Sequence, residues 1–147
     1  MTRTLRTFAE TCLFSADSTY RMWWNADKGG FDDGPEAGDV VKVSAGRTLI
    51  IDKPCDLRTI RFEGEEPERV IVEPGCEVQA ADIRIRENYG RVDAYDGVIV
   101  GFNAGIVRIR GRFCRVDKNA PNSQIYFCDD CKSAVVNDAT IVMENKK

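Results

Sequence analysis

Residues 60–62, 83–85 and 107–109 read Ile-Arg-Phe, Ile-Arg-Ile and Val-Arg-Ile, so an apolar–arginine–apolar triplet occurs three times. Successive triplets are 23 and 24 residues apart. A second series of short apolar segments is interleaved with the first and recurs every 21 to 22 residues, at 70–72, 92–94, 114–116 and 135–136. Two interleaved series of short strands at one period are typical of a solenoid whose coils each contain several strands. The spacing predicts about four coils.

The segments after residue 39 are typical of β-strands. They are short, rich in Val and Ile, and separated by turn residues such as Pro54 and Gly75. A sandwich of hairpins also contains many short strands, but it favours Asn-Gly or Asp-Gly turns between longer alternating runs. Only Asp96-Gly97 fits that pattern. We therefore expect an all-β chain that forms a short parallel β-solenoid over residues 39–147.

The N-terminal residues have a different pattern. Five apolar residues in 4–14 follow the spacing of one helix face, namely Leu5, Phe8, Ala9, Cys12 and Leu13. Residues 15–38 have no period and contain many Gly, Ser and Asp residues, which are typical of loops. The sequence therefore predicts an N-terminal cap over residues 1–38, a helix plus a loop, that closes one end of the solenoid within a single structural unit.

Residues 38–51, which read GDVVKVSAGRTLII, resemble the first strand of right-handed parallel β-helices. This group includes pectate lyases, polysaccharide hydrolases and phage tailspikes. The resemblance covers residues 38–51 in detail and 52–143 in rhythm only, and Thr48-Leu49 stands where the family usually has an aromatic residue. It implies a right-handed parallel β-helix, whereas function does not follow from fold.

The bulk composition excludes several classes. The chain has 147 residues, of which 43% are apolar and 31% charged, with a net charge of −3. This charge is too small and of the wrong sign for a dedicated nucleic-acid binder. No apolar run approaches the roughly 20 residues that span a bilayer, and residues 1–12 lack the apolar stretch of a secretory signal. We expect cytoplasmic synthesis, with action in a virion or a host cytoplasm.

Arginines are the best candidates for binding a ligand. Arg61, Arg84 and Arg108 are predicted to point outward from one sheet, where Arg86 and Arg110 widen a basic stripe. Regularly spaced guanidinium groups suit the phosphates or carboxylates of an anionic ligand. The alternative is a solvated sheet face whose charges are balanced by acids.

Trp23 and Trp24 are the second candidates for ligand contacts. Their rings suit stacking on sugars or bases. The alternative is that they cover the apolar end of the solenoid core.

Cys128 and Cys131 have the CxxC spacing of metal and redox sites. A structural zinc site needs four ligands, and the sequence has neither a second CxxC nor any histidine. Because no secretory signal is expected, the six cysteines are predicted to be reduced. The sequence therefore predicts no cofactor and no metal, with these two thiols as weak candidates.

Catalysis is restricted by the lack of histidine, which excludes Ser-His-Asp and Cys-His chemistry. Glycoside hydrolysis needs only two carboxylates, and Asp93, Asp96 and Asp117 lie on or beside predicted strands. The resemblance to polysaccharide-degrading β-helices makes this the enzymatic hypothesis. Those enzymes have many more coils, so a short solenoid offers little groove.

The favoured hypothesis is a non-catalytic binding or structural module of phage or bacterial origin. It would contact a protein or glycan partner, or a second copy, through a sheet face or a solenoid end. An anionic ligand fits the arginines, whereas membrane and nucleic-acid partners are not expected. The alternatives are a small phage-encoded inhibitor of a host system and a polysaccharide hydrolase or lyase that uses carboxylates.

Overall fold

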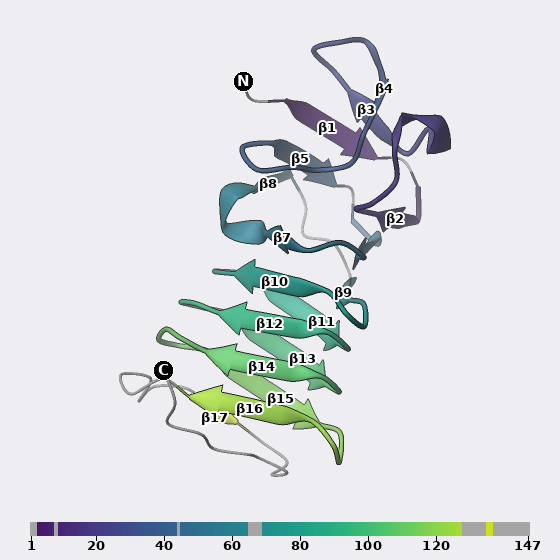
Figure 1. Ribbon diagram of the computed structural model, residues 1–147. Helices are drawn as coiled ribbons and strands as arrows, with labels where there is room; N and C mark the ends of the chain where they lie inside the picture. Colours follow the sequence, from purple (N-terminus) through teal and green to yellow (C-terminus); the bar gives the residue numbers. More distant parts are fainter. Residues whose placement is uncertain (1–2, 8, 44, 65–68, 128–134, 137–147) are drawn as a thin grey trace.

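The computed structural model describes residues 3–7, 9–43, 45–64, 69–127 and 135–136. These residues form a parallel β-solenoid of about five turns, in agreement with the expected fold class (Figure 1). In Figure 1 the coils stack from the purple N-terminal strands to the yellow-green β16. None of the helices among the described residues is long and apolar enough to cross a membrane.

Three sheets run along the stack. Sheet A has the order β4-β3-β1-β5-β8, sheet B the order β17-β15-β13-β11-β9-β6-β2, and sheet C the order β16-β14-β12-β10-β7. The bounds are β1 Thr4–Thr7, β2 Thr11–Leu13, η1 Ser18–Tyr20, β3 Trp23–Asn25, β4 Gly30–Asp32, β5 Val40–Val43, β6 Thr48–Ile51, β7 Cys55–Asp56, η2 Leu57–Thr59, β8 Arg61–Gly64, β9 Arg69–Val72, β10 Glu77–Ala80, β11 Arg84–Asn88, β12 Arg91–Ala94, β13 Ile99–Asn103, β14 Ile106–Ile109, β15 Arg115–Asn119, β16 Gln124–Phe127 and β17 Val135–Val136.

Aliphatic ladders hold the coils together. In sheet C, Val78, Val92, Val107 and Ile125 are in register on adjacent parallel strands, and all four are fully buried. Alternate residues of a strand point to opposite faces, so one apolar residue in two is enough to fill the core. Burial of each such side chain contributes about 1.5–3 kcal/mol relative to its exposure.

The coils become narrower partway along the stack. Strands β5, β6 and β7, and then β8, β9 and β10, each form a three-strand coil, in which Val41 of one coil pairs with Phe62 of the next. After β10, residues 81–83 lead directly to β11, so the later coils have one strand in sheet B and one in sheet C. In these later coils Val92 pairs with Val107, and fewer residues separate this pair than separate Val41 from Phe62 in the three-strand coils. The single long period expected from the triplets is therefore wrong for the C-terminal half.

The three arginine triplets consequently lie on different sheets. Arg61 belongs to β8 in sheet A, Arg84 to β11 in sheet B, and Arg108 to β14 in sheet C. The predicted placement of all three on one sheet is wrong. The triplet marks any strand with one outward residue between two inward ones, and it does not identify which sheet holds that strand.

The predicted N-terminal helix is also wrong for the described residues. Residues 4–14 contain β1 and β2, and residues 15–38 contain η1 and the strands β3 and β4. Strand β1 pairs with β5 in parallel and with β3 in antiparallel fashion, so the β3–β4 hairpin extends sheet A beyond the first coil. Leu5 and Thr7 point inward with a period of two, and backbone pairing on both sides of β1 outweighs the helical spacing of the apolar residues.

Asparagines line the turn between sheets B and C. Asn88 and Asn103 are fully buried, and Asn88 Nδ2 donates to Asn103 Oδ1 at 3.0 Å. Asn103 Nδ2 in turn donates to Asn119 Oδ1 at 3.2 Å. Because the residues at this corner repeat every 15 to 16 positions, the amide side chains form a continuous ladder along the stack. The ladder satisfies polar groups that would otherwise be costly to bury.

Candidate ligand-binding cleft

A cleft of about 970 Å³ lies where sheet A ends. Among the described strands, β8 is the last of that sheet, and residues 81–84 take the chain past the position where a further strand would lie. The cleft is bordered by β8, by residues 81–84 and by residues of β9, β11, β13 and β15. It is therefore a direct product of the change from three-strand to two-strand coils.

Apolar side chains form a large part of the cleft lining. They come from η2 and the residue that follows it, from β8, from the 81–83 connection and from β13, and include Leu57, Ile60, Phe62, Ile83, Ile99 and Phe102. Phe62, Ile83 and Phe102 are half-buried, so the cleft exposes part of each side chain to a ligand. Tyr89 at the cleft lies beside Phe102, with ring centroids 6.4 Å apart.

Three of the four cleft carboxylates have cationic partners. Glu87 pairs with Arg69 and accepts a hydrogen bond from the Tyr89 hydroxyl at 2.6 Å. These hydrogen bonds lower the pKa of the Glu87 carboxyl. Glu63 lies 3.0 Å from Arg61, and Asp117 lies 2.7 Å from Arg115. The fourth carboxylate, Asp82, has no ion pair within the described part of the chain.

Two cleft arginines form no ion pair within the described part of the chain. Arg84 and Arg86 are exposed on β11, and neither lies within ion-pair distance of an acid in the described residues. Arg58, by contrast, is held by Asp56 through Nη2–Oδ2 at 2.8 Å and stacks over Tyr95 at 4.0 Å. Among the described residues, the cleft lining thus has two arginines, Arg84 and Arg86, and one carboxylate, Asp82, without an ion pair within 4.0 Å, and the charge of Arg86 also lowers the pKa of the Glu87 carboxyl.

The remaining arginine candidates lie elsewhere. Arg61 is at the exposed side of β8 and pairs with Glu63. Arg108, on sheet C, lies 5.8 Å from the ring centroid of Tyr126, and Arg110 follows the end of β14. The five arginines that were expected to form one stripe therefore occur at three places, and only Arg84 and Arg86 line the cleft.

The two tryptophans lie in the hairpin of the cap. Trp23 is fully buried, packs edge-on against Phe14 and donates through Nε1 to the Leu13 carbonyl at 2.8 Å. Trp24 is half-buried and packs edge-on against Phe31, with ring centroids 5.3 Å apart. Their surroundings match the core-covering alternative, and neither residue borders the cleft.

The three aspartates proposed as catalytic are not gathered. Asp93 is on β12 in sheet C, Asp96 is in the connection that follows it, and Asp117 is on β15 in sheet B. Asp93 is nearly buried, with Arg91 and Arg110 at 3.9 Å. Asp96 Oδ1 accepts the Arg112 backbone N–H at 2.7 Å and so stabilises a turn. Only Asp117 borders the cleft.

The cysteines that the structure describes are free thiols: Cys12, Cys55, Cys76 and Cys114. Burial raises the pKa of all four, and that of Cys55 to about 11, so these thiols stay protonated and unreactive near neutral pH. Within the described ranges, no three His, Cys, Asp or Glu side chains are grouped as metal ligands. Cys128 and Cys131 lie outside the described residues.

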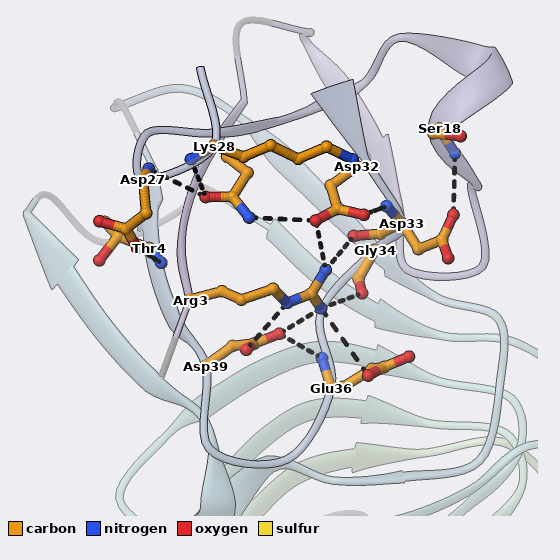
Figure 2. Close-up of polar contacts among 11 residues, drawn as sticks. Arg3, Thr4, Ser18, Asp27, Lys28, Asp32, Asp33, Gly34, Glu36 and Asp39 are labelled. Atoms are coloured by element: carbon orange, nitrogen blue, oxygen red, sulfur yellow. Dashed lines mark hydrogen bonds and ion pairs between the residues drawn. The ribbon is translucent and has the colours of Figure 1, made fainter. Parts of the chain in front are cut away.

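A second charged cluster surrounds Arg3 at the N-terminal end (Figure 2). Arg3 lies 2.6 Å from Asp39 and 3.3 Å from Asp32, and it also donates to the Gly34 carbonyl at 3.1 Å. Asp39 precedes β5, whereas Asp32 ends β4. The cluster therefore ties the hairpin to the first coils, and its groups are satisfied by one another.

The cleft was not foreseen, although Arg84 and Arg86 were singled out. A signal for the narrower coils is present in the sequence, because Asn-x-Gly occurs at 88–90 and again at 103–105. The two asparagines of this motif are hydrogen-bonded on adjacent coils, so their spacing is the true coil length of this part of the stack.

Comparisons with protein-family models, curated proteins and solved structures find no match to this chain.

Proposed function

We propose that this protein is a non-catalytic binding module whose cleft beside β8 binds a ligand that has both an anionic and an apolar part. The observation that supports this proposal most directly is that Arg84 and Arg86, which form no ion pair among the described residues, lie next to the apolar lining. Ligand sites are typically concave and largely apolar, with a few polar groups that orient the ligand.

The two parts of the cleft have separate roles in this proposal. A carboxylate or phosphate is held by the guanidinium groups of Arg84 and Arg86, which suit planar anions. The apolar part of the ligand covers Phe62, Ile83 and Phe102, and its burial contributes about 25 cal/mol per Å² of apolar surface. The paired acids Glu87 and Glu63 leave the site available to an anion, because their charge is balanced by arginines.

A binding role is better supported than glycan cleavage. The likeness of residues 38–51 to polysaccharide-degrading β-helices concerns the first coil. A glycosidase requires a pair of carboxylates that flank the scissile glycosidic bond, one on each side. Asp93, Asp96 and Asp117 are distributed over two sheets and a connection. The cleft groups with the strongest support are cations and apolar side chains, which bind a ligand without acting on it.

The proposal is tested with anilinonaphthalene sulfonate, a fluorescent aromatic anion that combines both chemistries. We expect Arg84→Gln with Arg86→Gln to weaken its binding about 30-fold, because two charge-assisted contacts of about 1 kcal/mol each are lost. The matched control is Arg6→Gln with Arg112→Gln, which removes two exposed arginines outside the cleft lining. Equal affinity for the two double variants would exclude the cleft as the binding site.

A further inference from the structure

The cleft occupies the position of a missing strand. Among the described strands, sheets B and C continue past β10, whereas sheet A stops at β8, because residues 81–83 connect β10 directly to β11. A third strand of that coil would lie beside β8, over the 81–84 segment. Residues of β8 and of the 81–84 segment both line the cleft. The size and place of the cleft therefore follow from one strand that this part of the chain does not supply.

The edge of β8 that faces this position has backbone groups without a hydrogen-bond partner among the described residues. Within the described residues β8 pairs with one strand only, β5. The Arg61 N–H donates to the Asp39 carbonyl at 2.9 Å, on the β5 side. In a parallel ladder, alternate residues direct their N–H and C=O groups to opposite neighbours. Phe62 and Gly64 therefore direct theirs away from β5, toward the cleft that both residues line.

We propose that the ligand of the cleft is an extended peptide segment of a partner protein, which adds to β8 as the next strand of sheet A. This inference rests on the proposed function of the cleft and specifies its ligand. An unpaired strand edge is a template for another strand, and strand addition is a common mode of peptide recognition. Main-chain hydrogen bonds give the affinity, whereas pockets for alternate side chains give the specificity.

The side chains of the cleft define the peptide chemistry. In an added strand, alternate residues face opposite sides. Aliphatic residues of one set contact Phe62 and Ile83, and an acidic residue pairs with Arg84 or Arg86, which form no ion pair within 4.0 Å among the described residues. The expected peptide therefore alternates aliphatic and acidic residues over about four positions, which is the length of β5 and β8.

Backbone amide exchange of the full-length protein, measured by NMR, tests strand addition directly. The probe is a pool of capped ten-residue peptides in which Val, Ile or Leu alternates with Asp or Glu. We expect the pool to slow exchange of the Phe62 and Gly64 amides by about tenfold or more, because they become hydrogen-bonded. The amides of Arg61 and Glu63, which face β5, serve as internal controls and change little.

Peptide variants separate strand addition from side-chain docking without altering the protein. The most abundant bound peptide is resynthesised in two forms, each N-methylated at alternate residues, so that each form lacks the donors of one edge. We expect one form to lose binding and the other to retain it. Equal binding of both forms would overturn the proposal, because main-chain pairing would then not be required.

The remaining outcomes are also decisive. Protection of Phe62 and Gly64 before peptide is added would mean that the chain itself, or a second copy, occupies the edge, and would overturn the inference. If the pool gives no protection while anilinonaphthalene sulfonate binds through Arg84 and Arg86, strand addition is wrong and the proposed function stands. If neither probe depends on the cleft, both proposals are wrong.

Discussion

At the scale of single residues, Asn103 occupies a position that few other side chains can fill. Its Oδ1 accepts from Asn88 Nδ2 at 3.0 Å and from the Gly105 N–H at 3.1 Å, whereas its Nδ2 donates to Asn119. The side chain thereby joins three successive coils and closes its own turn. A donor and an acceptor in one short side chain are both required here, and Asn provides them.

We therefore expect Asn103→Ala to lower the free energy of unfolding by about 2–4 kcal/mol, because Asn88 Nδ2 loses one of its two acceptors and the part-buried Gly105 N–H loses its side-chain acceptor. Urea denaturation at neutral pH measures the loss. The matched control is Asn122→Ala, an exposed asparagine in the following turn, which should change stability by less than about 0.5 kcal/mol. Similar losses in both variants would show that the ladder contributes little to stability.

At the scale of elements, the β3–β4 hairpin depends on ionised carboxylates. Hydrogen bonds from the Asn25 side chain, the Asp33 backbone N–H and Arg3 lower the pKa of Asp32 to about 2 from its usual 3.8. A carboxyl group with a lowered folded-state pKa stabilises the fold at pH values above its unfolded pKa. This contribution is complete above about pH 4 and is lost as the pH falls from 4 to 2.

Asp32→Asn should make the stability of the protein less dependent on pH between 4 and 2. At pH 6 the variant should be less stable than the unsubstituted protein. The reason is that the variant has no proton to take up at this position and lacks the charged acceptor for Arg3. Urea midpoints at several pH values measure both effects. Glu10→Gln, at an exposed carboxyl outside the cluster, controls for the change in charge. An unchanged slope in Asp32→Asn would contradict the assignment.

The same elements show where sequence patterns are ambiguous. Leu5, Cys12 and Leu13 fit a helix by spacing, yet Leu5 and Cys12 are inward residues of two strands. A run of only four residues is compatible with the period of a helix and with the period of a strand. Which of the two forms is therefore decided by whether neighbouring strands are available for pairing. Trp23 and Trp24 were placed in a loop because the Gly-rich turn between β3 and β4 hides a hairpin of three-residue strands.

At the scale of the whole molecule, the solenoid was predictable and the cleft was not. Short Val- and Ile-rich strands separated by turns indicate stacked coils whatever their length, so the fold class was correct. Coil length depends on how closely neighbouring turns approach. At Gly105 an added Cβ would overlap the Gly90 carbonyl, so the turn after sheet B is narrow. The end of sheet A, and with it the cleft, follows from that three-dimensional stacking.

The N-terminal end of the stack gives the last prediction. A solenoid transmits stability from coil to coil, and its terminal edge must be covered to prevent association. Trp23 is fully buried in that cover, whereas Trp24 is half-buried on the same strand. Trp23→Ala should cost about 3–5 kcal/mol, a large part of the total stability of a small domain, and Trp24→Ala should cost less than half of that. Urea denaturation measures the difference, and light scattering should detect association only in Trp23→Ala, because its first coil loses its cover. Equal losses in the two variants would mean that the hairpin does not protect the end of the solenoid.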